Sequence, residues 1–250
     1  MSPRALGKQQ QFDRENLIMD CALELIERDG IGVLTMDKLV AELPYSKGTV
    51  YNHFTSKEDL LLALCNRSMD VLATLFLKSE AFEGLLREKA LAVFFAYMLY
   101  ARLHPTQFML VITAKSAQVT EKASCCRTDE HVQLESKLVD PILRIFEQAL
   151  AEGVLCPPPG LSLEQLVFYC WSLGFGANAL LLQGVDRCTT RSELVVEKEM
   201  LHGSNILFDG LGFQPATSEF DWSDTIQRLK RDIFFEEVKQ LESHGVVLAI

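Results

Sequence analysis

The chain has 250 residues, of which 48% are hydrophobic, and a formal net charge of −10. This composition supports a sizeable core and excludes an intrinsically disordered chain. The N-terminus lacks the apolar stretch of a secretory signal, and no uninterrupted apolar run reaches the roughly 20 residues of a membrane span. We therefore expect a cytoplasmic protein without membrane segments.

The seven cysteines are odd in number and irregularly spaced, and no CxxC motif occurs. This pattern argues against a disulfide framework or a zinc site, so we expect no metal and no cofactor. The adjacent pair Cys125-Cys126 lies in a polar stretch, and the sequence assigns it no role. The chain also lacks a P-loop, a dinucleotide fingerprint and a nucleophile elbow, and we expect no enzymatic activity.

Residues 14–29 form the first predicted helix, because apolar side chains recur there at helical spacing. They are Leu17, Ile18, Cys21, Ala22, Leu25 and Ile26. Gly30 and Gly32 end this helix. The sequence therefore predicts one amphipathic helix with a single buried face.

Two short helices are predicted next, at 35–43 and 46–53. Thr35 and Ser46 are suitable N-caps, and Pro44 ends the first helix because it lacks a backbone donor. Such a pair, joined by a tight turn and supported by a longer helix, is the pattern of a helix-turn-helix.

Helices account for nearly all of the remaining chain. The fourth begins at Thr55 or Ser56, and Thr55 with Glu58 fits the capping-box pattern. Further helices are predicted at about 83–103, 106–117, 131–152, 163–183, 193–209 and 222–243. No strand-period alternation and no internal repeat is visible, so the expected fold class is all-α.

The second short helix carries the chemistry of a DNA contact. In a helix-turn-helix this helix enters the major groove by its N-terminal end. Lys47 suits a guanine edge or a phosphate, and Gly48 lets the backbone approach the base edges. Thr49, Tyr51 and His53 offer donors to phosphate oxygens.

The neighbouring positions fit the same role. Ser46 leaves backbone N–H groups at the helix start free to meet a phosphate, and Lys57 can neutralise another one. Val50 and Phe54 are expected to point inward. No acidic residue lies between positions 43 and 57, so a small non-acidic face could exist on this acidic protein.

The stretch "TMDKLVAELPYSKGTVYNHFTSKEDLL" resembles the N-terminal signature of the tetracycline-repressor (TetR) family of regulators. The resemblance covers about residues 14–65. The matching positions are Thr35, Ser46, Gly48, Thr49, Tyr51, His53, Phe54, Ser56, Lys57, Glu58 and Leu60. Two positions depart from the family: Pro44 stands where glycine is common in the turn, and Val40 stands where a small residue is usual.

The resemblance implies a cytoplasmic homodimer that binds a palindromic operator in double-stranded DNA and a small-molecule effector. It implies a DNA-binding domain at 1–60 and an effector-binding and dimerisation domain at 61–250. By position, Thr35, Thr49, Tyr51, His53 and Lys57 would hold phosphates. Lys47, Gly48 and Asn52 would face bases, and Ser46 would cap the recognition helix.

The C-terminal part of the chain is rich in aromatic and apolar side chains. Segment 163–183 is apolar on nearly all sides, which is typical of a helix buried against its own domain and a partner. The resemblance implies a dimer interface of four helices, two from each protomer, and 163–183 and 193–209 are the candidates for it. The role of 222–243 stays open. Candidate effector-binding residues are polar groups in apolar neighbourhoods, each of which also fits a structural role. They are Tyr97, Arg102, Gln107, Tyr169 and Asn178.

The sequence thus predicts a transcriptional regulator, with repression relieved by an apolar or aromatic effector. Two alternatives remain: an enzyme on a helical scaffold, and a small-molecule-binding or adaptor protein without specific DNA binding. The basic N-terminal residues Arg4 and Lys8 could reach the minor groove or a phosphate, or belong to a mobile tail.

Overall fold

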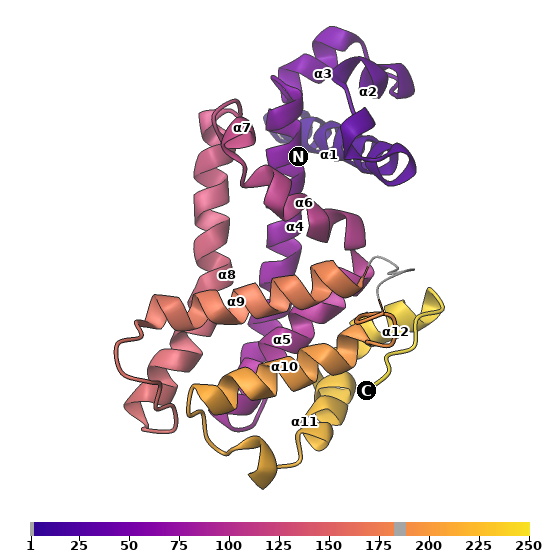
Figure 1. Cartoon of the computed structure of the whole chain (residues 1–250). Coiled ribbons are helices and arrows are strands. Elements are labelled where there is room, and N and C mark those ends of the chain that lie inside the picture. The colour runs from indigo at the N-terminus through magenta and orange to yellow at the C-terminus, as the bar shows by residue number, and fades with distance from the viewer. Residues whose placement is uncertain (1–2, 183–188) are drawn as a thin grey trace. The chain divides into compact units, whose positions relative to one another are not determined.

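The computed structural model describes residues 3–182 and 189–250 (Figure 1). Across these residues the chain is all-α, as predicted, and has no strand. The predicted break at 184–191 and Cys188 lie wholly or largely outside the described residues. The α-helices are α1 Pro3–Asp29, α2 Met36–Glu42, α3 Lys47–His53, α4 Lys57–Glu80, α5 Leu86–Leu103, α6 Pro105–Ala114, α7 Ala117–Thr120, α8 Cys125–Ala151, α9 Leu163–Leu181, α10 Val196–Gly210, α11 Trp222–Arg228 and α12 Phe235–Ser243. Short 3₁₀ turns cover Ile31–Val33 and Thr217–Glu219, and a π-helical turn covers Leu229–Ile233.

The chain divides into two compact units. The first unit comprises residues 1–69 and 106–134, and the second comprises 70–105 and 135–250. The first unit therefore contains the predicted DNA-binding region together with a segment from the middle of the chain. The three unit boundaries fall inside α4, after the first residue of α6, and inside α8.

In the first unit, α1 supports α2 and α3 through a small apolar core. Ile18, Ala22, Leu39, Val50 and Phe54 are fully buried, which confirms the inward positions expected for the two short helices. Leu17 is 43% exposed, contrary to the expected stripe. The buried face of α1 is centred on Ile18 and Ala22, so Leu17 lies at its edge.

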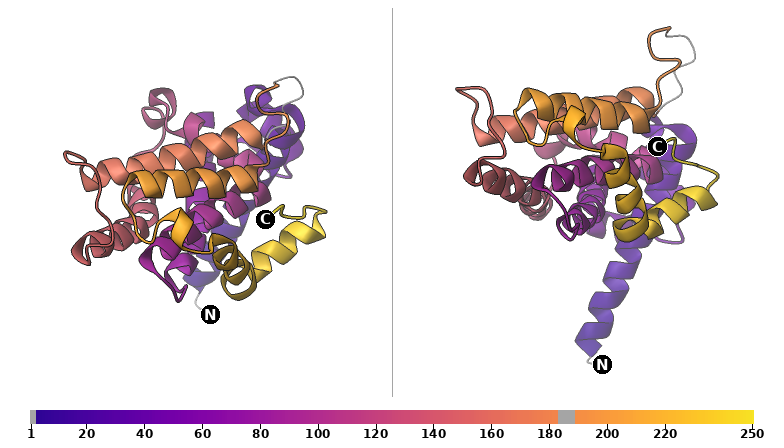
Figure 2. Two further views of the ribbon diagram at one scale, coloured as in Figure 1. Left: turned by 60° about the horizontal axis from the view of Figure 1, so that its bottom comes forward. Right: turned by 90° about the horizontal axis from the view of Figure 1, so that it is seen from below.

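The second unit is built around α5. Most residues of α5 are buried, and the helix contacts α9, α10, α11 and α12. Helices α9 and α10 lie side by side (Figures 1 and 2). This arrangement leaves the faces of α9 and α10 that point away from α5 without an apolar partner in the described chain.

One helix of the described residues, α4, has the length and hydropathy of a membrane span. Within its most apolar window, 72% of the residues are buried inside the protein. A core helix passes the same test of length and composition, so the apolar character of α4 is explained by its own packing.

Two predicted helix starts were wrong. Helix α1 begins at Pro3 rather than at residue 14, and α8 begins at Cys125 rather than at 131. The polar residues of 3–13 are good helix formers, which periodicity alone does not register. At α8, the Ser124 carbonyl accepts the amides of Arg127 and Thr128, so the helix starts inside the predicted loop.

The predicted C-terminal helix 222–243 is broken. It consists of α11, the π-helical turn and α12, with the break at Phe234. Phe234 is fully buried, and its ring centroid lies 5.7 Å from that of Phe95 on α5. Burying the Phe234 ring in the core stabilises the chain more than an unbroken regular helix would.

Candidate nucleic-acid interface

Side-chain caps define the start of each helix of the helix-turn-helix. Thr35 accepts a hydrogen bond from the Lys38 amide, and Ser46 accepts one from the Thr49 amide. Both caps are the ones predicted, and each satisfies an amide that the first turn of a helix leaves free. The start of α3 is therefore set by its own sequence.

The α2–α3 turn contains Pro44 and no residue with positive φ. Leu43 has φ −104° and ψ 148°, which is ordinary extended backbone. The turn therefore does not use the left-handed conformation that glycine would allow, as expected for proline at this position.

The outer face of α3 is exposed and polar. Lys47, Gly48, Tyr51 and Asn52 are all exposed, while Val50 on the opposite face is buried. A Cβ built on Gly48 would meet only Ser46 Oγ, at 4.0 Å. The backbone at Gly48 is thus open to close approach from outside.

The Lys47 side chain contacts residues of the first unit. Its Nζ lies 2.6 Å from Asp37 Oδ1 on α2 and 5.6 Å from the centroid of the Tyr51 ring. The hydrogen bond and charge of Asp37 raise the pKa of Lys47. The first positive charge of α3 is therefore neutralised in part by an acidic residue that faces the same surface.

Two further predicted contacts have intramolecular partners. Thr49 Oγ1 lies 2.9 Å from Ser46 Oγ, and Lys57 Nζ donates to the Ile31 carbonyl at 3.1 Å. The ammonium of Lys57 retains further donors, since it carries three. Both residues are half-buried at the edge of the α3 face.

His53 lies differently from the other predicted DNA-binding residues. Its side chain is 4% exposed, and Nδ1 lies 3.6 Å from Glu15 Oε2 on α1. This distance is too long for a hydrogen bond, and the buried Nδ1 has no hydrogen-bond partner among the described residues. The phosphate contact of His53 stays a prediction, and its placement favours a link between α3 and α1.

A buried carboxylate holds the start of α4. Ser56, not Thr55, accepts the hydrogen bond of the capping turn, and its donor is the amide of Asp59, so the predicted Thr55–Glu58 box was wrong. The Asp59 carboxylate accepts bonds from the amides and hydroxyls of Thr55 and Ser124. Burial favours a higher pKa for Asp59, but these four hydrogen bonds outweigh it and lower the pKa.

Arg127 on α8 joins the same segment to the helix-turn-helix. It pairs with Glu15 on α1, and its guanidinium carbon lies 5.7 Å from the centroid of the Phe54 ring. Sequence reasoning missed Asp59, Ser124 and Arg127, because each acts through a partner more than 60 residues away. No local signal could have found these pairs.

The five candidate effector residues do not converge. Gln107 belongs to the first unit and the other four to the second. Tyr97 and Asn178 meet around Gly174: the Asn178 amide donates to the Gly174 carbonyl, and Tyr97 packs on the glycine itself. Arg102 pairs with the buried Glu197, and Tyr169 is 37% exposed.

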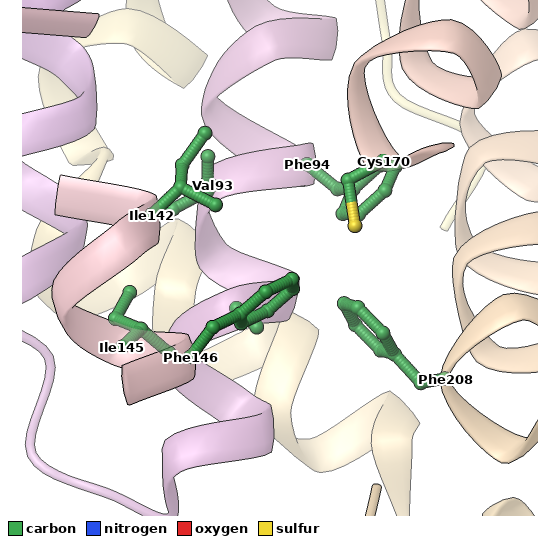
Figure 3. A pocket seen from close by; sticks show the side chains of 8 residues that line it. Val93, Phe94, Ile142, Ile145, Phe146, Cys170 and Phe208 are labelled. Atoms are coloured by element: carbon green, nitrogen blue, oxygen red, sulfur yellow. The ribbon is translucent and has the colours of Figure 1, made fainter. Parts of the chain in front are cut away.

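A small apolar pocket lies elsewhere in the second unit (Figure 3). It encloses about 240 Å³ of empty space, part of it open to solvent, and none of the five candidates lines it. Phe146, Cys170 and Phe208 point into this space. Burial raises the pKa of the Cys170 thiol to about 12, so Cys170 is a neutral, apolar part of the wall.

An exposed aromatic face covers one side of α9. Phe168, Tyr169 and Trp171 are each more than one-third exposed, and their rings contact one another. Ile206 on the neighbouring α10 is 73% exposed. Gly176 lies on α9 with open space at its Cβ position. Exposed apolar patches of this kind mark interaction sites.

Comparison with known proteins gives a family match for the helix-turn-helix region. Residues 18–64 match the model for bacterial regulatory proteins of the tetR family. An uncharacterised helix-turn-helix-type transcriptional regulator of Mycobacterium tuberculosis is 30% identical over 106 residues, which are 42% of this chain and 47% of that protein. The match thus spans about half the length of this curated relative.

Solved structures share the fold of about four-fifths of the chain. A tetR-family regulatory protein from Rhodococcus is 17% identical with a TM-score of 0.61, covering 80% of this chain and 98% of that one. AibR, solved in complex with isovaleryl coenzyme A and operator DNA, is 19% identical with a TM-score of 0.57, covering 78% and 98%. The predicted resemblance and the all-α fold are confirmed.

Proposed function

We propose that this chain, which belongs through its helix-turn-helix domain to the tetR family of bacterial regulatory proteins, is a homodimeric repressor released from its operator by a small effector. A DNA-binding transcriptional regulator is what the family and the fold indicate. The observation that carries the proposal is the exposed outer face of α3, polar and without an acidic residue, on a helix anchored from below by Val50 and Phe54.

We assign base contacts to the leading part of this face. Lys47 can donate to guanine, Asn52 can pair with adenine, and Gly48 lets the backbone come close. Asp37 holds the Lys47 ammonium and offsets part of its charge in the free protein, so this pair would weaken the attraction of Lys47 to DNA. Asp37 therefore opposes non-specific binding of DNA. Only a well-placed acceptor on DNA would compensate for weakening the Lys47–Asp37 pair.

Phosphate contacts are assigned to the residues around this face: Thr35, Thr49, Tyr51 and Lys57. Such contacts fix the register of a protein on the duplex without reading sequence. Ser46 would act as the cap that orients α3. We assign His53 a supporting role between α3 and α1, because its side chain is almost fully buried.

The dimer would form through the exposed apolar faces of α9 and α10. A two-fold dimer places two recognition helices on DNA, and half-sites about 34–36 Å apart would then make a palindromic operator. Because the operator is bacterial DNA, the site of action would be the cytoplasm.

The effector site would lie in the second unit. The apolar pocket with its phenylalanine walls favours an apolar or aromatic molecule. The cavity itself holds only about 20 Å³, far below the roughly 300–1,000 Å³ of typical ligand pockets, so it would have to open to admit a ligand. A ligand that weakens DNA binding must itself be weakened by DNA to the same extent.

Selection of random DNA by the purified protein tests this function directly. We expect enriched fragments that share a palindrome, and gel shifts that saturate with two protomers per site. Lys47→Ala should relax base preference at its own positions and weaken binding roughly tenfold there. Lys57→Ala should weaken operator and scrambled DNA equally, with a salt slope about 1.8 smaller for the dimer.

The same experiment separates the rival functions. Absence of any enriched sequence would contradict the proposal and favour an adaptor or a small-molecule-binding protein. Turnover of a small substrate by the purified chain would favour an enzyme. If Lys57→Ala changed base preference and Lys47→Ala changed only the salt slope, α3 would not be the reading helix.

A further inference from the structure

The N-terminal part of α1 is a helix without a packing partner. Helix α1 begins at Pro3, and residues 7–13 are exposed on every side. Figure 2 (right) shows this part of α1 as a rod that ends at the N-terminus of the chain. These residues extend the packed part of α1, and their exposed side chains are accessible to a partner outside the chain.

This segment adjoins the recognition helix. The Arg14 guanidinium carbon lies 5.4 Å from the ring centroid of Tyr45, which directly precedes the α3 cap. Glu15 lies beside His53 at the other end of α3. Residues 3–13 therefore continue from the point where α1 crosses α3, and they add roughly 16 Å of helix at 1.5 Å per residue.

The charge of the segment is opposite to that of the chain. Residues 3–13 contain Arg4 and Lys8 against the single acid Asp13, a net charge of +1 in a chain of −10. The Gln9 amide donates to Asp13 Oδ1 at 2.8 Å, so this acid is already engaged. A basic end beside the DNA-reading helix is complementary to phosphate.

The uncharged side chains suit DNA as well. Gln9, Gln10 and Gln11 carry amides that donate to phosphate oxygens and can pair with adenine edges. Phe12 is 60% exposed and can contact a thymine methyl group. Residues 7–13 thus combine the positive charge of Lys8, amide donors and one apolar side chain, all of them exposed.

We propose that residues 3–13 of α1 form a second DNA contact, to the phosphates and base edges that flank the half-site read by α3. This inference rests on the proposed function and extends it, because it adds flanking DNA to what the protein recognises. The partner is duplex DNA, and a second copy of the chain is the competing occupant that the test excludes.

Footprinting on operator duplexes with long and short flanks tests the inference. The full chain should protect flanking base pairs and bind long duplexes more tightly than short ones. A variant lacking residues 1–11 should lose both differences while still reading the same central sequence. Lys8→Ala should reduce the salt slope by about 1.8 for the dimer, whereas the control Lys239→Ala on α12 should leave it unchanged.

The outcomes are distinguishable from failure of the proposed function. If the truncated chain binds with unchanged affinity, footprint and flank dependence, the segment does not contact DNA and the inference fails alone. If the truncation weakens dimerisation in light scattering without changing DNA binding per dimer, a second copy is the occupant and the inference is also overturned. If the full chain binds no DNA selectively, both proposals fail together.

Discussion

The two units of the chain use polar residues in opposite ways. In the first unit, the predicted DNA-binding side chains lie within one stretch of 23 residues, from Thr35 to Lys57, and all except the buried His53 are exposed or half-buried. In the second unit, the charged side chains of Arg87 and Glu197 are buried, and each is paired with a residue far away in the sequence. Arg87 meets Asp209, and Arg102 meets Glu197, over 122 and 95 positions.

This difference has a physical consequence. Exposed side chains form only weak ion pairs, so substituting them costs little free energy of unfolding. Their substitution is therefore expected to alter binding. Buried charges are stable only with their partners, so changing them alters folding. We therefore expect substitutions in α3 to affect DNA affinity alone, and substitutions at the buried charges to affect the second unit alone.

The largest effect is expected at Arg87, whose side chain is fully buried. Its guanidinium donates to the carbonyls of Asn205, Phe213 and Pro215 and to the side chains of Asn205, Asp209 and Thr217. Arg87→Met leaves these acceptors unpaired, and we expect a loss of about 3–5 kcal/mol in the free energy of unfolding. Urea titration followed by circular dichroism measures it.

Arg231→Met is the matched control. Arg231 is 71% exposed and pairs only with the adjacent Asp232, so its loss should leave the unfolding midpoint almost unchanged. A similar effect of both variants, or a stable Arg87→Met protein, would contradict the contrast between buried and exposed charges.

The next effect concerns assembly rather than folding. Gly176 has open space at its Cβ position within the chain, so Gly176→Leu should not disturb the protomer. If α9 forms the dimer interface, the added side chain overfills it, at a cost of about 1–3 kcal/mol. Light scattering over a concentration series should then show a shift from dimer to monomer.

Gly174→Ala provides the comparison on the same helix. A Cβ at Gly174 would lie 3.0 Å from Tyr97 Cδ1 inside the protomer, so this change should lower the unfolding midpoint instead. A Gly176→Leu protein that remains dimeric at micromolar concentration would place the interface elsewhere.

Asp59 is an exception to this contrast, because it is a buried charge in the first unit. Its folded pKa is below the unfolded value, so its contribution to stability is present above about pH 4 and is lost as the pH falls through the lowered pKa. At pH 7, Asp59→Asn should lower the free energy of unfolding by about 1–3 kcal/mol. The difference from the parent chain should shrink at lower pH in urea titrations, and a constant difference would contradict this account.

The same contrast explains what the sequence could predict. The caps Thr35 and Ser46 and the inward Val50 and Phe54 act within a few residues, so helical spacing and capping rules located them. The early start of α8 depends on Ser124 meeting Asp59, and the break at Phe234 depends on Phe95. Such long-range contacts leave no local pattern. The apolar pocket is lined by residues from four separate helices, so no local pattern could locate it. The five candidate effector residues stay predictions.

The smallest effect is expected at the surface pair Lys47–Asp37. Because Asp37 holds the Lys47 ammonium in the free protein and faces the DNA side, Asp37→Asn should release Lys47 and remove a charge that repels phosphate. An exposed ion pair of this kind is weak, so we expect operator affinity to rise only roughly two- to fivefold, with an unchanged unfolding midpoint. In the background of Lys47→Ala, Asp37→Asn should raise operator affinity less, because the released donor is then missing.

Fluorescence anisotropy on operator and scrambled duplexes measures the change in affinity in both backgrounds. An equal gain in the two backgrounds would mean that Asp37 acts through its charge alone, and a loss of affinity would mean that Asp37 orients Lys47 for DNA instead of withholding it.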